Sequence, residues 1–286
     1  MIEVADTQNE IYAQAYGQNI MQLAQQKYSK LLGTVYLKPN VRGKTFFQDQ
    51  IGEWSMSTKG GRNVVTPNND PALARRMGVM LDYHDNRMLD RGDELKSISD
   101  PRSAYTIAAA RSLGRKIDDV IIAAAMSTST ASGETGSTTA PTTATVVITA
   151  SQLFLTNITD MKKELDDNDV EQEDRFLVIT PTLLASALED SSMTSSDYAS
   201  VKALVRGEIN TFMGFNWIMS TRIGAYTTLA IEGLVYQKNA LCLAMADQPL
   251  VRTDERSDLS YSWQIYYELN CGAVRLEESR IRKIRA

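Results

Sequence analysis

A single histidine flanked by carboxylates is the part of this sequence that most resembles an acid–base site. His84 is the only histidine, and it lies between Asp82 and Asp85 in the segment DYHD. An imidazole beside carboxylates can move a proton, but no second histidine is present to complete a metal site or to pair with a cysteine. The patterns GxxxxGKS/T, GxGxxG, HExxH and GxSxG are also absent. We expect His84 to be structural or exposed, with no catalytic residue, metal or cofactor in the chain.

Two adjacent carboxylates, Asp118 and Asp119, are the other candidate groups for a cytoplasmic α/β enzyme that uses carboxylates alone. They lie in a helical pattern, where neighbouring positions point about 100° apart and do not converge on one substrate. Arg111 and Arg115 precede them at helical spacing. We interpret the four residues as surface groups that form charge pairs, with a neighbouring subunit as the candidate partner.

Composition is typical of a folded protein of one or two domains. The chain has 286 residues, of which 43% are hydrophobic and 23% are charged, and its net charge is -5. No run of Lys and Arg suggests a nucleic-acid site. No apolar stretch is long enough to span a membrane, and no signal peptide is evident. Cys242 and Cys271 lie far apart without a CxxC, so we expect buried thiols in a reducing cytoplasm.

The first 30 or so residues form a polar arm with a weak helical pattern. Its apolar positions, spaced three or four apart, are Tyr12, Tyr16, Ile20 and Leu23. Because so few apolar residues cannot offset the entropy lost on ordering, we expect the arm to order only when it contacts another subunit.

A long hairpin follows the arm. Lys44–Ser57 and Arg75–Tyr83 have strand-like patterns, and Thr58–Pro71 between them is rich in Gly, Pro and Asn. The sequence predicts a two-stranded projection whose tip includes Lys59, Gly60, Gly61, Arg62 and Asn63. An isolated hairpin is only marginally stable in water, so we expect its tip to contact a neighbouring molecule.

A long helix is predicted from Asp100, where Asp and Pro provide an N-cap and a first turn. Its core stripe includes Leu113, Ile117 and Ile121. Ser127–Thr145 is rich in Ser and Thr, and we expect an exposed loop or loose hairpin there.

An α/β pattern occupies residues 150–248. Its expected helices and strands, in order, are Ala150–Asp166, Phe176–Ile179, Thr180–Leu188, Ser195–Val205, Phe212–Met219 and Thr227–Tyr236. Aromatic-rich strands then follow at Leu259–Leu269 and Cys271–Leu276. These last strands must pair with segments far back in the sequence.

The order of these elements resembles the major capsid proteins of tailed bacteriophages, which have the HK-ninety-seven-like fold. The resemblance covers nearly the whole chain and rests on five segments in order: KTFFQDQIG (Lys44–Gly52), DPRSAYTIAAARSLGRKIDDVIIAAA (Asp100–Ala125), ITPTLLASALED (Ile179–Asp190), TSSDYASVKALVRGEINTFMGFNWI (Thr194–Ile218) and DERSDLSYSWQIYYELNCGAVRLEE (Asp254–Glu278).

This resemblance implies an α+β fold in five parts. They are an N-terminal arm (1–35), an extended E-loop hairpin with flanking strands (36–94), a peripheral domain with a long spine helix (95–149), an axial domain (150–248), and strands that return to the peripheral domain (249–286). Some relatives crosslink an E-loop lysine to an asparagine of a partner subunit. Lys59 lies near the tip, but nothing identifies its partner, so we expect no crosslink.

The implied function is that of a structural major capsid protein, located in the virion after synthesis in the host cytoplasm. Such subunits self-assemble as hexamers and pentamers into an icosahedral head that encloses double-stranded DNA. Because only about 30 polar residues precede the body, we expect a separate scaffolding protein. A portal protein, with or without a decoration protein, completes the partners, and an acidic subunit implies weak, unspecific DNA contact. The alternative within this fold is an encapsulin-like compartment that holds cargo.

Overall fold

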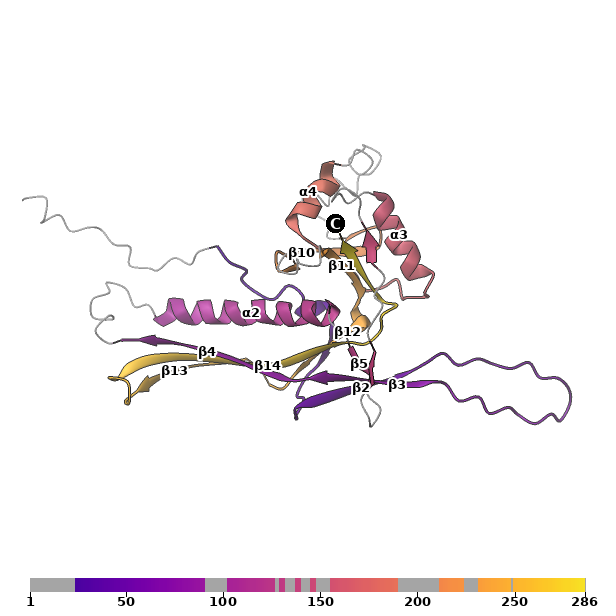
Figure 1. Cartoon of the computed structure of the whole chain (residues 1–286), viewed down its shortest axis with the longest axis horizontal. Helices are drawn as coiled ribbons and strands as arrows, with labels where there is room; N and C mark the ends of the chain where they lie inside the picture. The colour runs from indigo at the N-terminus through magenta and orange to yellow at the C-terminus, as the bar shows by residue number, and fades with distance from the viewer. Residues whose placement is uncertain are drawn as a thin grey trace, which may run out of the picture.

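The computed structural model describes residues 24–90, 102–126, 129–131, 137–139, 145–147, 155–189, 211–223, 231–247 and 249–285. Within these residues the chain forms three sheets, which confirms the expected α+β class. The helices of this part are α2 (Arg102–Met126), α3 (Leu155–Asp166), α4 (Pro181–Glu189) and the 3₁₀ helices η2 (Leu32–Thr34) and η5 (Lys238–Ala240). Figure 1 shows α2 as a long rod that lies along one sheet, with α3 and α4 at one end of it.

An elongated five-stranded sheet lies beneath α2 (Figure 1). Its strands are β1 (Tyr36–Lys38), β4 (Leu81–Leu89), β12 (Leu241–Met245), β13 (Leu250–Arg256) and β14 (Ser262–Arg275). β14 pairs with β4 along nine residues, and the partners Tyr267 and Asp85 are 182 positions apart in the chain. This pairing confirms the expectation that the C-terminal strands pair far back in the sequence.

A four-stranded sheet carries the projecting hairpin. It consists of β2 (Thr45–Ile51), β3 (Leu73–Val79), β5 (Ser129–Ala131) and β6 (Ser137–Thr139), all antiparallel. β5 and β6 form a hairpin, which is one of the two structures expected for residues 127–145. Because β5 pairs with β3, this segment extends the hairpin sheet.

The strand predicted over Arg75–Tyr83 is interrupted at Met80. The amide of Met80 donates to the carbonyl of Lys44 at 2.9 Å, and the chain then enters β4 of the elongated sheet. The crossing point lies directly over Gly272, where an added Cβ would be 2.1 Å from the carbonyl oxygen of Val79. An alternating pattern cannot reveal such a change of sheet, because both strands have the same two-residue period.

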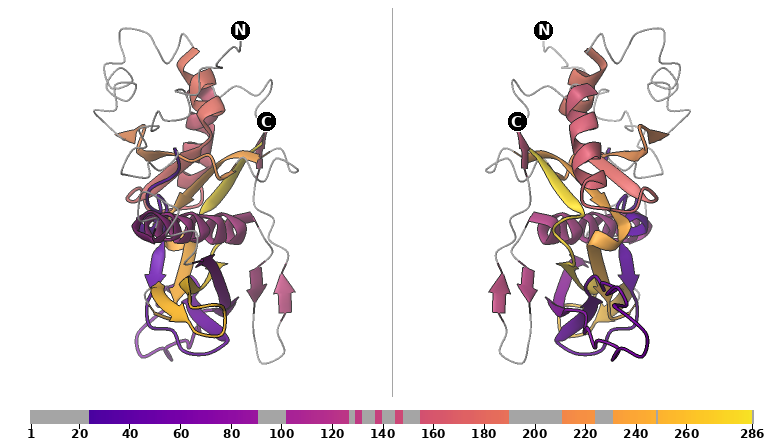
Figure 2. Two further views of the ribbon diagram at one scale, coloured as in Figure 1. Left: turned by 90° about the vertical axis from the view of Figure 1, so that its left-hand side faces the viewer. Right: turned by 90° about the vertical axis from the view of Figure 1, so that its right-hand side faces the viewer.

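A six-stranded sheet lies on the other side of α2 from the elongated sheet (Figure 2). Its order is β7 (Thr145–Val147), β15 (Ile281–Arg285), β11 (Ile231–Gln237), β8 (Arg175–Ile179), β10 (Phe215–Met219) and β9 (Thr211–Phe212). The buried side chains of α3 and α4, among them Met161, Leu165 and Leu183, pack with this sheet in one core cluster.

Three expectations for this region are corrected by the sheets. The segment 150–248 does not form one unit, since β12 belongs to the elongated sheet. The segment 249–286 does not return entirely to the elongated sheet, because β15 pairs with β11 and β7. Phe212–Met219 is not one strand. It turns back at Met213 and Gly214, whose positive φ angles of 53° and 85° suit a tight hairpin turn.

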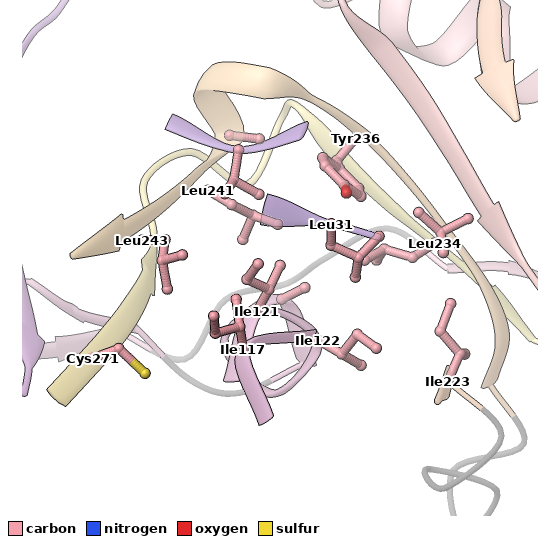
Figure 3. Packing of buried hydrophobic residues seen from close by; sticks show 14 of the residues in the cluster. Leu31, Ile117, Ile121, Ile122, Ile223, Leu234, Tyr236, Leu241, Leu243 and Cys271 are labelled. Carbon is pink, nitrogen blue, oxygen red and sulfur yellow. The ribbon is translucent and has the colours of Figure 1, made fainter. Parts of the chain in front are cut away.

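The largest hydrophobic cluster joins α2 to both sheets, as Figure 3 shows. Leu113, Ile117 and Ile121 of α2 are 7%, 5% and 0% exposed. Their neighbours in the cluster include Leu243 of the elongated sheet and Leu234 of the six-stranded sheet. The spine helix therefore holds the two sheets together through a single core.

Several predictions lie outside the described residues. These are the arm positions Tyr12, Tyr16, Ile20 and Leu23, the helix start at Asp100–Pro101, and the helix expected over Ser195–Val205.

Candidate assembly interface

The hairpin tip, residues 52–72, extends well beyond the sheets (Figure 1). Lys59, Gly60, Gly61, Arg62 and Asn63 are all exposed, with a turn at the last two of them. Apolar side chains are exposed here as well: Trp54 is 71%, Met56 99% and Val65 88% accessible. The tip thus presents apolar surface that its own chain leaves uncovered.

The base of the hairpin is tied to the body by charged groups. Arg76 of β3 donates to Glu278 at 2.9 Å and to the carbonyl of Leu276 at 3.1 Å. Arg75, on the opposite face of the strand, binds the carboxylate of Asp49 on β2, and this hydrogen bond lowers the pKa of Asp49. The exposed pair stabilises the ladder little, whereas the half-buried Arg76–Glu278 pair fixes the hairpin on the C-terminal segment.

Two cations cover the C-terminal end of α2. The guanidinium of Arg275 donates to the carbonyl of Ala125 at 2.9 Å, and Lys283 reaches the carbonyl of Met126 at 3.4 Å. Burial lowers the pKa of both groups. Positive charge at this position compensates the helix dipole and the unpaired carbonyls of the last turn, so β14 and β15 are both attached to the helix end.

The structure corrects the expectation that Asp118 forms an intersubunit charge pair. Its side chain is fully buried, and it accepts hydrogen bonds from four groups of residues 26–31 of the same chain, so it is not available to a neighbouring subunit. Asp119 is partly exposed, and it forms a bidentate ion pair with Arg222. Arg115 donates to Gln25 at 2.7 Å.

Arg111 is half-buried, and its Nε has no hydrogen-bond partner among the residues that the structure describes. Of the four candidate charge-pair residues, the structure turns three toward segments of the chain that the sequence did not connect with α2: Arg115 toward Gln25, Asp118 toward residues 26–31 and Asp119 toward Arg222.

His84 lies on β4, beside a pocket between this strand and α2. His84 pairs in register with Glu268 on β14, and its ring lies 6.4 Å from that of Tyr266. It borders a pocket of about 360 Å³ between β4 and α2, where Tyr267 donates to Asp85 at 2.9 Å. Burial and this carboxylate raise the pKa of Tyr267, which keeps the phenol protonated at neutral pH. In the described part of the chain no three His, Cys, Asp or Glu residues are grouped to hold a metal ion.

Both cysteines are free and buried, as expected. Burial raises the pKa of Cys242 and of Cys271 to about 11, so both thiols are neutral and unreactive. Among the described residues, no helix has the length and apolar character needed to cross a membrane.

A family model for phage capsid proteins matches residues 9–286, nearly the entire chain. The chain belongs to this family of phage capsid proteins. It is therefore a structural major capsid protein, which assembles with other copies into the shell of a virion, and the family indicates a structural rather than a catalytic role. No curated protein sequence matches it.

Solved capsid structures share the capsid protein's fold. The capsid of cyanophage P-SCSP1u is similar with a TM-score of 0.77 and 16% identity, over 97% of this chain and 94% of the other. The head of Helicobacter pylori bacteriophage KHP40 is similar with a TM-score of 0.76 and 9% identity, over 99% and 98%. The capsid of a native GTA particle has a TM-score of 0.73 and 12% identity, over 99% and 97%. The resemblance to the HK-ninety-seven-like fold is confirmed, and neither the encapsulin nor the enzyme alternative receives support.

Sequence reasoning missed the contacts that fix the capsid protein's hairpin and arm. Arg76 and Glu278 are 202 positions apart, and Asp118 lies 87 positions from Leu31. Nothing in the spacing of these residues links them. The one available signal is Gly114, an unfavourable residue in the middle of a long helix, which indicates a close approach of another segment.

Proposed function

We propose that the hairpin tip binds a neighbouring subunit within the hexamers and pentamers of an icosahedral head. The observation that carries this proposal is the apolar surface of residues 52–72, far from any core of the same chain. Burying a side chain the size of Trp54 or Met56 contributes about 1.5 to 3 kcal/mol. The free energy of each contact is small, but a closed symmetric shell contains many copies of the same contact.

The sheets suggest how the parts divide this work. We assign the elongated sheet with α2 to the peripheral domain, and the six-stranded sheet with α3 and α4 to the axial domain around which the rings close. In this assignment β12 and β15 cross between the two domains. A connection by two strands and one shared core would make the subunit move as a single body during assembly.

The remaining partners follow from the family and from charge. We propose that the subunit assembles into a head together with a separate scaffolding protein and a portal protein, and that a decoration protein is an optional further partner. Double-stranded DNA would be enclosed with weak, unspecific contact, because a net charge of -5 does not favour tight phosphate binding.

Deleting residues 59–68 tests the role of the tip. Asn69 donates to the hydroxyl of Ser57 at 3.2 Å, so the two sides of the hairpin are adjacent just below the deleted segment and can be rejoined without strain. We expect a subunit with unchanged urea stability that forms no shells in electron micrographs after co-expression with its candidate scaffold.

Substitution provides a matched pair of variants. Met56→Ser with Val65→Ser removes exposed apolar surface, and Thr58→Ser with Thr66→Ser changes the same loop without removing such large groups. The first pair should reduce the yield of particles strongly, and the second should leave it unchanged. Normal particles from the deletion, or equal yields from both pairs, would show that the tip is not an assembly contact.

A further inference from the structure

The spine helix carries a docking notch for the N-terminal arm. One side of α2 is contacted by residues 26–31, the arm root, which reach it just before the chain enters η2. Gly114 and Asp118 are four residues apart on the helix, so they lie one above the other on the same side. Together they receive the backbone of the arm root.

Gly114 provides the space. A Cβ added at this position would lie 2.9 Å from the amide nitrogen of Ser29 and 3.2 Å from the carbonyl carbon of Tyr28. Both atoms belong to the backbone, which cannot rotate away as a side chain can. The absence of a side chain on α2 therefore lets the arm root lie directly against the helix.

Asp118 provides the binding groups. Its Oδ1 accepts from the hydroxyl of Ser29 at 2.6 Å and the amide of Leu31 at 3.1 Å, and its Oδ2 accepts from Nε2 of Gln26 at 2.5 Å and the amide of Lys30 at 3.1 Å. Two donors at each oxygen use the full acceptor capacity of a carboxylate. All four donors come from the arm root, so the carboxylate is dedicated to this one segment.

Contacts on either side lock the arm root in register. Leu31 is fully buried in the main core, and its carbonyl accepts from the hydroxyl of Thr34 at 2.7 Å. The same hydroxyl forms a hydrogen bond of 2.6 Å with the phenol of Tyr236 on β11. The arm root is thus held to α2 and to the six-stranded sheet at once.

We infer that Gly114 and Asp118 are positioning residues, which fix the place and direction at which the arm leaves the body so that every copy presents it to the same part of a neighbouring copy. The inference rests on the expectation, drawn from the sequence, that the arm contacts other subunits. Without the notch, the arm would remain attached but would lose its defined starting direction.

Two variants of the full chain test the notch from different sides. In Asp118→Asn the side chain keeps its shape, but an amide group that is itself a donor replaces one acceptor oxygen and opposes two of the four donors. In Gly114→Ala the carboxylate is intact, and the helix itself gains propensity, but the added methyl group displaces the arm root. Asp119→Asn is the matched control, because it removes the adjacent charge without touching the arm root.

Hydrogen exchange and trypsin report on the arm root directly. The amides of Lys30 and Leu31 should exchange at least tenfold faster in both variants than in the parent and the control, whereas core amides such as that of Leu243 should change less than twofold in Gly114→Ala. Residues 1–26 contain no Lys or Arg, so the first tryptic sites are Lys27 and Lys30. Cleavage there should accelerate at least tenfold in the unassembled variants.

The yield and shape of assembled particles distinguish a failure of this inference from a failure of the proposed function. Fast exchange at Lys30 and Leu31 together with poor or misshapen particles supports the notch and the role of the arm. Fast exchange with normal particles supports the notch as an attachment but overturns its positioning role and the arm's part in assembly. Unchanged exchange and cleavage in both variants would overturn the notch itself, as would insolubility of both, which would place these residues in the folding core instead.

Discussion

Replacing Ile121 by alanine should destabilise the unassembled subunit by about 3 to 4 kcal/mol. Ile121 is completely buried in the cluster that joins α2 to both sheets. The change removes three carbon atoms, and their transfer from water contributes about 0.8 kcal/mol each, or roughly 2.4 kcal/mol in total. A cavity term is added, because neighbours such as Leu31 and Leu241 are held by their own strands and turns and cannot collapse fully into the space.

Urea unfolding curves recorded by circular dichroism measure this loss, provided that the variant and the parent have equal m-values. Ile107 offers the matched control, since it is the same residue type in the same helix and is 48% exposed. Ile107→Ala should cost about 1 kcal/mol or less, because little apolar area leaves the interior and no cavity forms. Equal costs for the two variants, or a cost below about 1.5 kcal/mol for Ile121→Ala, would refute the view that the spine helix organises the core.

Three further results are expected. Cys242 and Cys271 should resist alkylation at pH 8 in the native subunit and react rapidly in urea, as seen by mass spectrometry, because burial raises the pKa of each to about 11. Burial raises the pKa of Glu277, but hydrogen bonds such as that from Arg280 outweigh this effect and leave the pKa below 4.5. The ionised carboxylate therefore stabilises the fold above that pH, and this contribution is lost as the pH falls through the folded pKa. The urea midpoint of Glu277→Gln should fall less steeply below pH 4.5 than that of the parent. Gly272→Ala should give insoluble protein in a pelleting assay, and soluble subunit with parental stability would contradict the close crossing of the hairpin base.

The sequence predicted the elements with strong local patterns and missed the connections between them. The spine helix was predicted well because Leu113, Ile117 and Ile121 repeat at the helical period and are flanked by polar residues. The projecting hairpin was predicted because Gly, Pro and Asn are concentrated between two alternating segments. Both signals are contained within about 25 to 40 consecutive residues, and no distant partner is needed to interpret them.

The missed features depend on segments that meet only in space. The sequence predicts no separate strand over β15, whose pairing with β11 is decided by the core around Ile281 and Ile284. Asp118 was read as a surface charge because a charged residue on a helix is usually exposed. Its burial is tolerated only because four donors arrive from residues 26–31, a segment whose own sequence shows no trace of this contact.

The pairing of β4 with β14 sets the order of events during synthesis. Tyr267 must be made before Asp85 can find its partner across the sheet, 182 residues later in the chain. At roughly 5 to 20 residues per second, a ribosome needs about 9 to 36 s for that interval. During this time the apolar stripe of α2 has no completed sheet to cover it, and the hairpin tip, although already synthesised, extends from a body that is not yet complete. We expect shell growth to draw only on chains whose synthesis has passed β14, because the sheet that supports the hairpin is incomplete before then.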